Sequence, residues 1–409
     1  MLKNYLNKGS EFFRTDLTYV ASGGSWIFAS NIISSIASFI LVIAFGNLLS
    51  PTTYGVYQYV ISIAGILATP TLAGINTAMV RAIARGLEGS FTMGLKTKIR
   101  WGLLGGLASL ILALYYYLND NNTLSISFLI TAIFLPFMDS FGVYGSVLAG
   151  RKMFGKSTLY TFVINLIRVT TLVTLLFLTD NVLLIIFAYF ATTTTLRLLF
   201  LIVVIKTYGL NDKTDPSLIS YGKHLSLMTV LGNIASNLDK ILLFQFLGAA
   251  ELATYSFAMA PISRLKTFLA PIETLAFPKF SERDPDTLKK NLPRKMFLFF
   301  LIILGIVGIY TIFAPFIYKI LLPNYVNAVP FSIALALSLL FVPQKLLAGS
   351  LTAHSQKKAL YVITTVGPIV KILTLLILLP ILGIWGAVVA FLIPLAINGI
   401  LAVYYFRKM

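Results

Sequence analysis

The chain of 409 residues has no cysteine and only two histidines, His224 and His354. The missing cysteines exclude disulfides, thiolate metal sites and a cysteine nucleophile, and two histidines so far apart argue against a histidine-rich metal site. Charge is also scarce, because Asp, Glu, Lys and Arg make up 11% of the residues, whereas a soluble globular protein carries about 25%. With 58% hydrophobic residues, the composition is that of a polytopic membrane protein.

Long apolar runs dominate the sequence. A helix that crosses a bilayer needs about 20 mostly apolar residues, and twelve segments meet that requirement. Proline, glycine or asparagine stands in most of the gaps between them. The sequence therefore predicts an all-α membrane protein with about twelve transmembrane helices. The predicted spans are 22–47, 54–77, 100–118, 124–149, 158–178, 182–205, 222–247, 252–275, 296–320, 328–350, 359–378 and 382–405.

The positive charges alternate between the loops. Of the 32 Lys and Arg residues, 24 fall in one alternate set of loops and in the terminal segments, among them Lys96, Lys98 and Arg100, and the other loops hold none. Lys and Arg remain on the cytoplasmic side of membrane proteins, so we expect both termini in the cytoplasm. The same distribution explains the net charge of +18 without nucleic acid as a partner.

The two halves of the chain resemble each other. An Asn-Ile pair at 31–32 recurs at 233–234, and a glycine at 46 recurs at 248, both 202 residues later. Both halves start and end on the same side, which makes the repeat parallel, and duplicated lobes suggest a transporter with a central cavity. The expected parts are an N-terminal six-helix lobe at 1–205, a cytoplasmic linker at 206–221 and a C-terminal six-helix lobe at 222–409.

Two segments resemble a known family. Residues 49–57, LSPTTYGVY, form a Leu-(Ser/Gly)-Pro-x-x-Tyr-Gly-x-Tyr turn, and residues 237–258 combine Asn-x-Asp, an apolar run, glycine and a tyrosine-bearing turn. Both are similar to Wzx-type O-antigen and polysaccharide flippases of the multidrug/oligosaccharidyl-lipid/polysaccharide (MOP) exporter superfamily. The resemblance implies two MATE-like lobes, alternating access, and translocation of a polyprenyl-linked oligosaccharide across the cytoplasmic membrane. It also implies glycan polymerase and chain-length machinery as partners.

Eight basic and three acidic residues fall within the predicted spans. A charge near the bilayer centre costs several kcal/mol unless it faces a cavity or a partner, so each is a functional candidate. The positive excess suits an anionic cargo such as a lipid-linked (pyro)phosphate, whereas a cavity for cationic drugs should be acidic or aromatic. The candidate substrate-binding residues are Arg264, Arg168, Lys371, Arg197, Lys240 and Lys345.

Arg264 ranks first among these cations because it is mid-span, and because the lipid II flippases of the superfamily also use basic residues in the corresponding cavity. The alternative role of each cation is an interhelical ion pair with Asp139 or Asp239. The two carboxylates are themselves candidates for binding a coupling ion, H+ or Na+, since ion coupling needs an intramembrane carboxylate. The sequence predicts no metal site and no other cofactor.

Three other functions remain as alternatives. A MATE-like, ion-coupled exporter of small organic compounds fits the topology but not the positive charge of the cavity. A membrane enzyme such as a polymerase or glycosyltransferase should have a large outer loop bearing Arg, Asp or His, whereas the predicted outer loops are short and free of Lys, Arg and His. A scaffold without transport activity would hold its mid-membrane charges at a high cost.

The octapeptide GRKMFGKS at 150–157 matches the phosphate-binding P-loop pattern letter for letter. A P-loop joins a buried strand to a helix, but here predicted membrane spans lie on both sides. We interpret the motif as a basic inner loop and expect no ATP. Three tyrosines of the second span, Tyr54, Tyr57 and Tyr59, are expected in an interfacial aromatic belt, with contact to sugar as the alternative.

Overall fold

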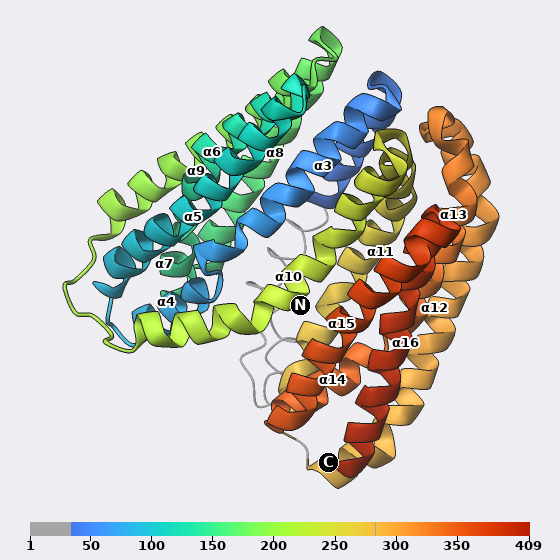
Figure 1. The fold of residues 1–409 in the computed structure, drawn as a ribbon. Coiled ribbons are helices and arrows are strands. Elements are labelled where there is room, and N and C mark those ends of the chain that lie inside the picture. Colours follow the sequence, from blue (N-terminus) through green and yellow to red (C-terminus); the bar gives the residue numbers. More distant parts are fainter. Residues whose placement is uncertain (1–33, 283) are drawn as a thin grey trace, which may run out of the picture.

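The computed structural model describes residues 34–282 and 284–409, with side chains for all of these except 270–279 and 281 (Figure 1). We call its two groups of helices the N-lobe and the C-lobe. The N-lobe consists of the helix Ser34–Leu48, α3 (Pro51–Leu67), η1 (Thr69–Thr71), α4 (Gly74–Ala84), α5 (Ser90–Leu118), α6 (Asn122–Phe141), α7 (Tyr144–Gly150), α8 (Phe154–Leu178) and α9 (Val182–Tyr208). The C-lobe consists of α10 (Leu218–Leu247), α11 (Ala249–Ser281), α12 (Pro285–Leu321), η2 (Pro323–Ala328), α13 (Val329–Ala336), η3 (Leu337–Phe341), α14 (Gln344–Ala353), α15 (Lys357–Leu382) and α16 (Ile384–Lys408).

The predicted all-α membrane fold is confirmed. In the described part of the chain, nine helical segments are long and apolar enough to cross a membrane, and the bent pair Pro51–Thr71 and Gly74–Ala84 makes a tenth. The two other predicted spans fall on the helix Ser34–Leu48 and on α11, which do not meet the same test. The count of twelve and the cytoplasmic location of both termini stay predictions.

The second predicted span, 54–77, is broken into two helical segments. Pro70 lies within the short η1, and Leu72 takes a left-handed conformation with φ of 59°; α4 is bent by 46° from the preceding segment. A left-handed residue other than glycine costs about 1–2 kcal/mol. The bend brings Thr71 and Asn76 beside α5 and α6, where both make the polar contacts described below.

A second kind of break occurs once in each half of the chain. The segment Asn122–Gly150 is interrupted between α6 and α7, at 142–143, and the segment Pro323–Ala353 is interrupted between η3 and α14, at 342–343. The two breaks lie 200 residues apart, close to the offset of the sequence repeat. They therefore extend the internal resemblance from sequence to helix geometry.

The two ends of the bundle differ in charge. At the neutral end, uppermost in Figure 1, the short turns after Leu48, Leu118, Leu178, Leu247, Leu321 and Leu382 contain no Lys or Arg. Ser50, Asn121 and Asn181 keep three of these turns short, because each accepts a hydrogen bond from a backbone amide at the start of the next helix. The opposite end, which we call the basic end, carries the turns after Ala84, Gly150, Tyr208 and Ala353 and the C-terminus.

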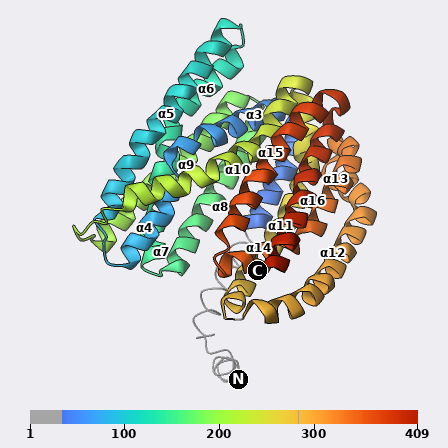
Figure 2. The same ribbon diagram turned by 60° about the horizontal axis from the view of Figure 1, so that its bottom comes forward.

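The apolar core is shared by both lobes toward the neutral end and divided toward the basic end. One large cluster joins residues such as Tyr57 and Tyr59 of α3 to Leu252 and Phe257 of α11. Two separate clusters lie toward the basic end, one around α4, α7 and α9 and the other around α12, α14 and α16. Among the described helices, α10 connects the lobes there, since it packs on α4 and α3 as well as on α15 (Figure 2).

Polar contacts reinforce the joined lobes at the neutral end. Asn47 Nδ2 donates to the carbonyl oxygen of Leu321 at 2.8 Å, and Asn324 Nδ2 donates to that of Gly46 at 3.2 Å. Gly55 is required here, because a Cβ at this position would overlap the Ala249 carbonyl. We call these contacts and the aromatic core beneath them the neutral-end closure.

An ion pair holds three turns of the basic end together. Arg151 donates from Nε and Nη2 to the two carboxylate oxygens of Glu88, at 2.7 and 2.8 Å, and also to the Gly209 carbonyl at 3.0 Å. Asn211 Nδ2 donates to the Gly86 carbonyl at 3.0 Å. We call Glu88, Arg151 and Asn211 the basic-end clamp.

Two basic residues of the P-loop-like motif at 150–157 make structural contacts at the basic end. The motif begins at the end of α7, a helix, whereas a phosphate-cradling loop follows a strand. Its Arg151 belongs to the clamp, and its Lys156 donates to the Tyr208 hydroxyl at 2.6 Å. The two basic side chains thus tie the end of α9 to the neighbouring turns.

The clamp predicts a pH-dependent stability. The two hydrogen bonds from Arg151 hold the pKa of the Glu88 carboxyl below its usual range, so their contribution is complete above the usual pKa, about 4.3, and is lost as pH falls through the lowered value. We expect Glu88→Gln to lower the midpoint of thermal unfolding at pH 7 but not at strongly acidic pH. Unfolding of both proteins across pH 3–8 measures this difference, and a gap that does not change with pH contradicts the prediction.

Candidate functional site

Asp139 is the centre of a polar group in the N-lobe. Its carboxylate lies 3.3 Å from Arg197 Nη1 on α9 and 4.0 Å from Lys98 Nζ on α5, and the Thr71 hydroxyl donates to it at 3.1 Å. Arg197 also donates to the carbonyl of Met138 at 2.7 Å. Two cations from two helices therefore face one carboxylate, which limits the cost of holding all three charges within the membrane.

Lys98 corrects the assignment made from the sequence, which placed it among the charges of an inner loop. Helix α5 begins at Ser90, ten residues before the predicted span, and the Lys98 side chain is fully buried. Its Nζ also donates to Asn76 Oδ1 at 3.1 Å. Residue spacing could have indicated this burial, because Lys98 lies four residues from Gly94 and from Gly102 and shares their buried helix face.

Asp239 is the centre of the matching group in the C-lobe. The ammonium of Lys371 on α15 lies 3.1 Å from its Oδ2, and the Tyr255 hydroxyl on α11 donates to the same oxygen at 3.2 Å. Only 6% of the Asp239 side chain is exposed. The half-buried Lys240 follows on α10, and its backbone N–H donates to Asp239 Oδ1 at 3.0 Å. Lys371 is the ion-pair partner that compensates the charge of this buried carboxylate.

Further positive charge gathers around Lys371. The ammonium groups of Lys266 and Lys371 lie 4.5 and 5.5 Å from the ring centroid of Phe391 on α16, and Lys345 on α14 interacts electrostatically with Lys266. Cation–π contact with the ring offsets part of the repulsion between the ammonium groups. Lys266 and Lys371 thus lie close together at the Phe391 ring, and Lys371 is also paired with Asp239.

Arg264 lies on α11, two residues from Lys266. Its Nε atom is buried and has no hydrogen-bond partner in the described part of the chain, while its charge acts on Tyr54 of α3. A buried donor without a partner costs about 1–3 kcal/mol, or more when charged. Arg264 is therefore a site where a ligand oxygen would restore a lost hydrogen bond.

Arg168, on α8 of the N-lobe, lies near a second tyrosine of α3. It donates to Asn165 Oδ1 at 2.8 Å, its guanidinium lies 5.5 Å from the ring centroid of Tyr189, and its charge acts on Tyr57 of α3. The Tyr54 and Tyr57 rings stack with centroids 6.2 Å apart. Arginines from both lobes thus reach neighbouring tyrosines on one helix.

The interfacial belt predicted for Tyr54, Tyr57 and Tyr59 is wrong. All three are buried in the shared core, where Tyr54 stacks on Phe257 with centroids 4.4 Å apart. The Tyr59 hydroxyl bonds to the Tyr116 hydroxyl and accepts from Gln245 on α10. Pairing between helices, rather than position along one helix, decides their location.

The six predicted cations do not form one site. Four lie on helices of the C-lobe, namely Arg264, Lys240, Lys345 and Lys371, whereas Arg197 belongs to the Asp139 group and Arg168 lies on α8 beside Tyr189. Among the described residues, no ion pair joins the Asp139 and Asp239 groups, and no cluster of three His, Asp or Glu side chains could hold a metal ion. Arg197 and Lys371 are ion-pair partners, which is the alternative role that the sequence left open.

The family profile described as polysaccharide biosynthesis protein matches residues 20–284, which is more than half of the chain. This chain belongs to that family. The uncharacterized membrane protein MJ1068 of Methanocaldococcus jannaschii is 23% identical to it, over 95% of this chain and 84% of the relative.

Solved structures show that this polysaccharide biosynthesis protein has the MOP-superfamily fold. An inward-facing multidrug resistance MATE family transporter matches with a TM-score of 0.69 and 15% identity, over 92% of this chain and 94% of the transporter. The lipid II flippase MurJ in an inward closed conformation matches with a TM-score of 0.69 and 16% identity, over 93% and 87%. The predicted MATE-like, MOP-type architecture is therefore confirmed.

The burial of Lys98 predicts coupling with Asp139 in this polysaccharide biosynthesis protein. Asp139→Asn leaves the Lys98 ammonium less compensated, and we expect a loss of about 3 kcal/mol, the low end for a broken buried pair because 35% of the Asp139 side chain is exposed. Adding Lys98→Met removes the stranded charge, so the double variant should unfold at a higher temperature than Asp139→Asn alone. Thermal unfolding of the four proteins tests this, and additive losses would contradict it.

Proposed function

We propose that this protein is a flippase that moves a polyprenyl-(pyro)phosphate-linked oligosaccharide or polysaccharide repeat unit across the cytoplasmic membrane by alternating access. The observation that carries the proposal is the buried Arg264 Nε, which has no hydrogen-bond partner among the described residues. A guanidinium group matches phosphate oxygens geometrically, and the Lys266 and Lys371 ammonium groups add positive charge to the same lobe. Membership of the polysaccharide biosynthesis family supports the same substrate class.

Alternating access is supported by the divided core. The lobes share one core near the neutral end and have separate cores near the basic end, so the basic end is where a ligand would enter between them. With the basic end in the cytoplasm, as the charge distribution predicts, this arrangement faces inward. Breaking the neutral-end closure would then release the cargo on the outer side.

The second candidate is an ion-coupled exporter of small organic compounds. The fold similarity to a multidrug resistance MATE transporter is its support. The charge around Asp239 disfavours it, because this carboxylate already pairs with Lys371, and Lys266 adds a second ammonium group at the Phe391 ring beside Lys371. A MOP-superfamily transporter of Pyrococcus furiosus (TM-score 0.60, 13% identity) is itself described as having reverse pocket polarity that suggests a different function.

Replacement of Arg264 tests the anion site. Arg264→Gln keeps hydrogen-bonding capacity but removes the charge, and we expect the initial flipping rate at limiting substrate to fall about tenfold or more, since a hydrogen bond to a charged group contributes about 1.5–3 kcal/mol. The assay follows protection of a lipid-linked oligosaccharide in proteoliposomes from an external glycosidase. Lys319→Gln, an exposed lysine at the neutral end of α12, is the matched control. Equal rates for Arg264→Gln and the control would refute the assignment.

Coupling to an ion gradient is the second part of the proposal. Asp239 is bound by Lys371 in this conformation, so H+ or Na+ would compete with that ammonium for the carboxylate. We expect Asp239→Asn to abolish the dependence of flipping on an imposed gradient. Because this change also strands Lys371, the variant Asp239→Asn with Lys371→Gln controls for the lost ion pair. Asp139→Asn separates the two candidate carboxylates, and dependence that survives in both single variants eliminates carboxylate coupling.

A further inference from the structure

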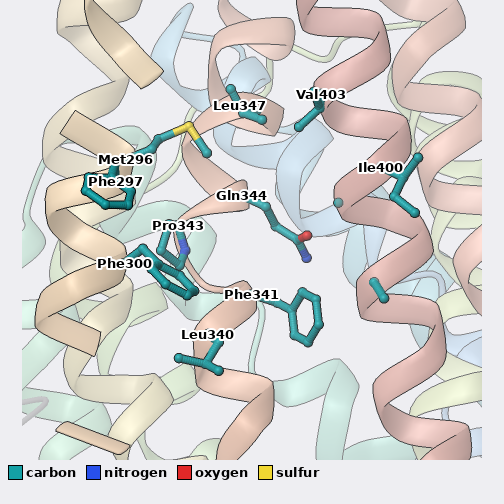
Figure 3. Close-up of a pocket in the computed structure, with 12 residues that line it drawn as sticks. Met296, Phe297, Phe300, Leu340, Phe341, Pro343, Gln344, Leu347, Ile400 and Val403 are labelled. Carbon is teal, nitrogen blue, oxygen red and sulfur yellow. The ribbon is translucent and has the colours of Figure 1, made fainter. Parts of the chain in front are cut away.

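A pocket of about 580 Å³ opens in the C-lobe between α12, α14 and α16. Pro343, at the break between η3 and α14, lines it, whereas the residues of the candidate functional site do not. Figure 3 shows Phe297 and Phe300 on one side, Ile400 on the other, and Gln344 between them. Its volume lies within the range of about 300–1,000 Å³ that is usual for small-ligand sites. Apart from the Gln344 amide, the side chains shown are apolar.

Two local features create this pocket. The chain turns from the 3₁₀ segment η3 into α14 at 342–343, which interrupts the wall that a continuous helix would form. On the opposite side, Ala396 and Gly399 are small, and a Cβ at Gly399 would overlap the Gln344 amide. The break between η3 and α14 is one of the two that recur in the halves of the chain. The small residues of α16 leave the space beside it open.

The pocket faces the lipid and not the predicted substrate site. Phe297 is 60% exposed and Ile400 is 69% exposed, and exposed apolar side chains of a membrane span contact acyl chains. On α14, Gln344 points into the pocket, whereas the next residue, Lys345, interacts with Lys266 of the cation group. Two adjacent residues at the start of α14 therefore belong to two sites of different chemistry.

The basic end of the pocket is flanked by arginines. Arg294 precedes Phe297 by three residues on α12, and Arg407 follows Val403 by four residues on α16, so each lies one helical turn beyond a pocket residue. Both are exposed. Because α12 begins and α16 ends at the basic end, both arginines lie on the side of the pocket that is toward this end, and basic pockets between membrane helices bind anionic lipid headgroups.

We propose that this pocket binds one acyl chain of an anionic phospholipid, with the lipid phosphate held by Arg294 and Arg407. The site is independent of the proposed flippase activity, and its occupant is a resident membrane lipid rather than the transported cargo. The apolar pocket binds the acyl chain of the lipid, and the two arginines favour a negatively charged headgroup.

Native mass spectrometry of the delipidated full-length chain tests the site. Phosphatidylglycerol and phosphatidylcholine with identical chains are the probes, and we expect one phosphatidylglycerol to be retained at least fivefold more than phosphatidylcholine. Ala396→Trp fills the pocket and should abolish this preference, whereas Ile309→Trp, on an exposed part of α12 outside the pocket, should preserve it. Arg294→Gln with Arg407→Gln should make the two lipids equivalent.

Two results would overturn the proposal. One is unchanged phosphatidylglycerol retention in a folded Ala396→Trp protein, with Val403→Trp as the substitute if Ala396→Trp does not fold, as judged by thermal unfolding. The other is displacement of phosphatidylglycerol by an equimolar polyprenyl phosphate, which would assign the pocket to the cargo.

Discussion

The cost of an ionised side chain inside a bilayer governs how this protein is built. A charge at mid-membrane depth must meet an opposite charge, a hydrogen-bond partner or water. Asp139 meets this requirement with Lys98 and Arg197, and Asp239 meets it with Lys371 and Tyr255. Each group joins at least two helices of one lobe, so the ion pairs that neutralise charge also hold each lobe together as a unit.

The proposed function depends on positive charge that this pairing does not compensate. The Nε of Arg264 is buried and has no hydrogen-bond partner among the described residues, and Lys266 lies at the Phe391 ring beside Lys371, which already pairs with Asp239. Under the proposal, a phosphate-bearing cargo would supply the missing hydrogen-bond acceptor, whereas a cationic cargo would not.

Much of the fold followed from local features of the sequence, because apolar length and the alternation of Lys and Arg along the chain act through the bilayer itself. The carboxylates Asp139 and Asp239 could also be singled out as intramembrane charges. Which cation pairs with each carboxylate could not be predicted, since Arg197 reaches Asp139 and Lys371 reaches Asp239 from helices far apart in sequence. For the same reason Tyr59, which bonds to Tyr116 and Gln245, could not be placed from its own helix.

The proposed alternating access requires the lobes to separate at the neutral end in every transport cycle. Since the chain has no cysteine, Asn47→Cys with Asn324→Cys introduces the only two thiols, at two exposed positions where the lobes meet. A short, reducible bis-thiol reagent joins them, and flipping of the lipid-linked oligosaccharide is then measured before and after reduction. The account predicts that the cross-link stops flipping, that reduction restores it, and that each single-cysteine variant is unaffected by the reagent. A cross-linked protein that flips its cargo at the uncross-linked rate would contradict it.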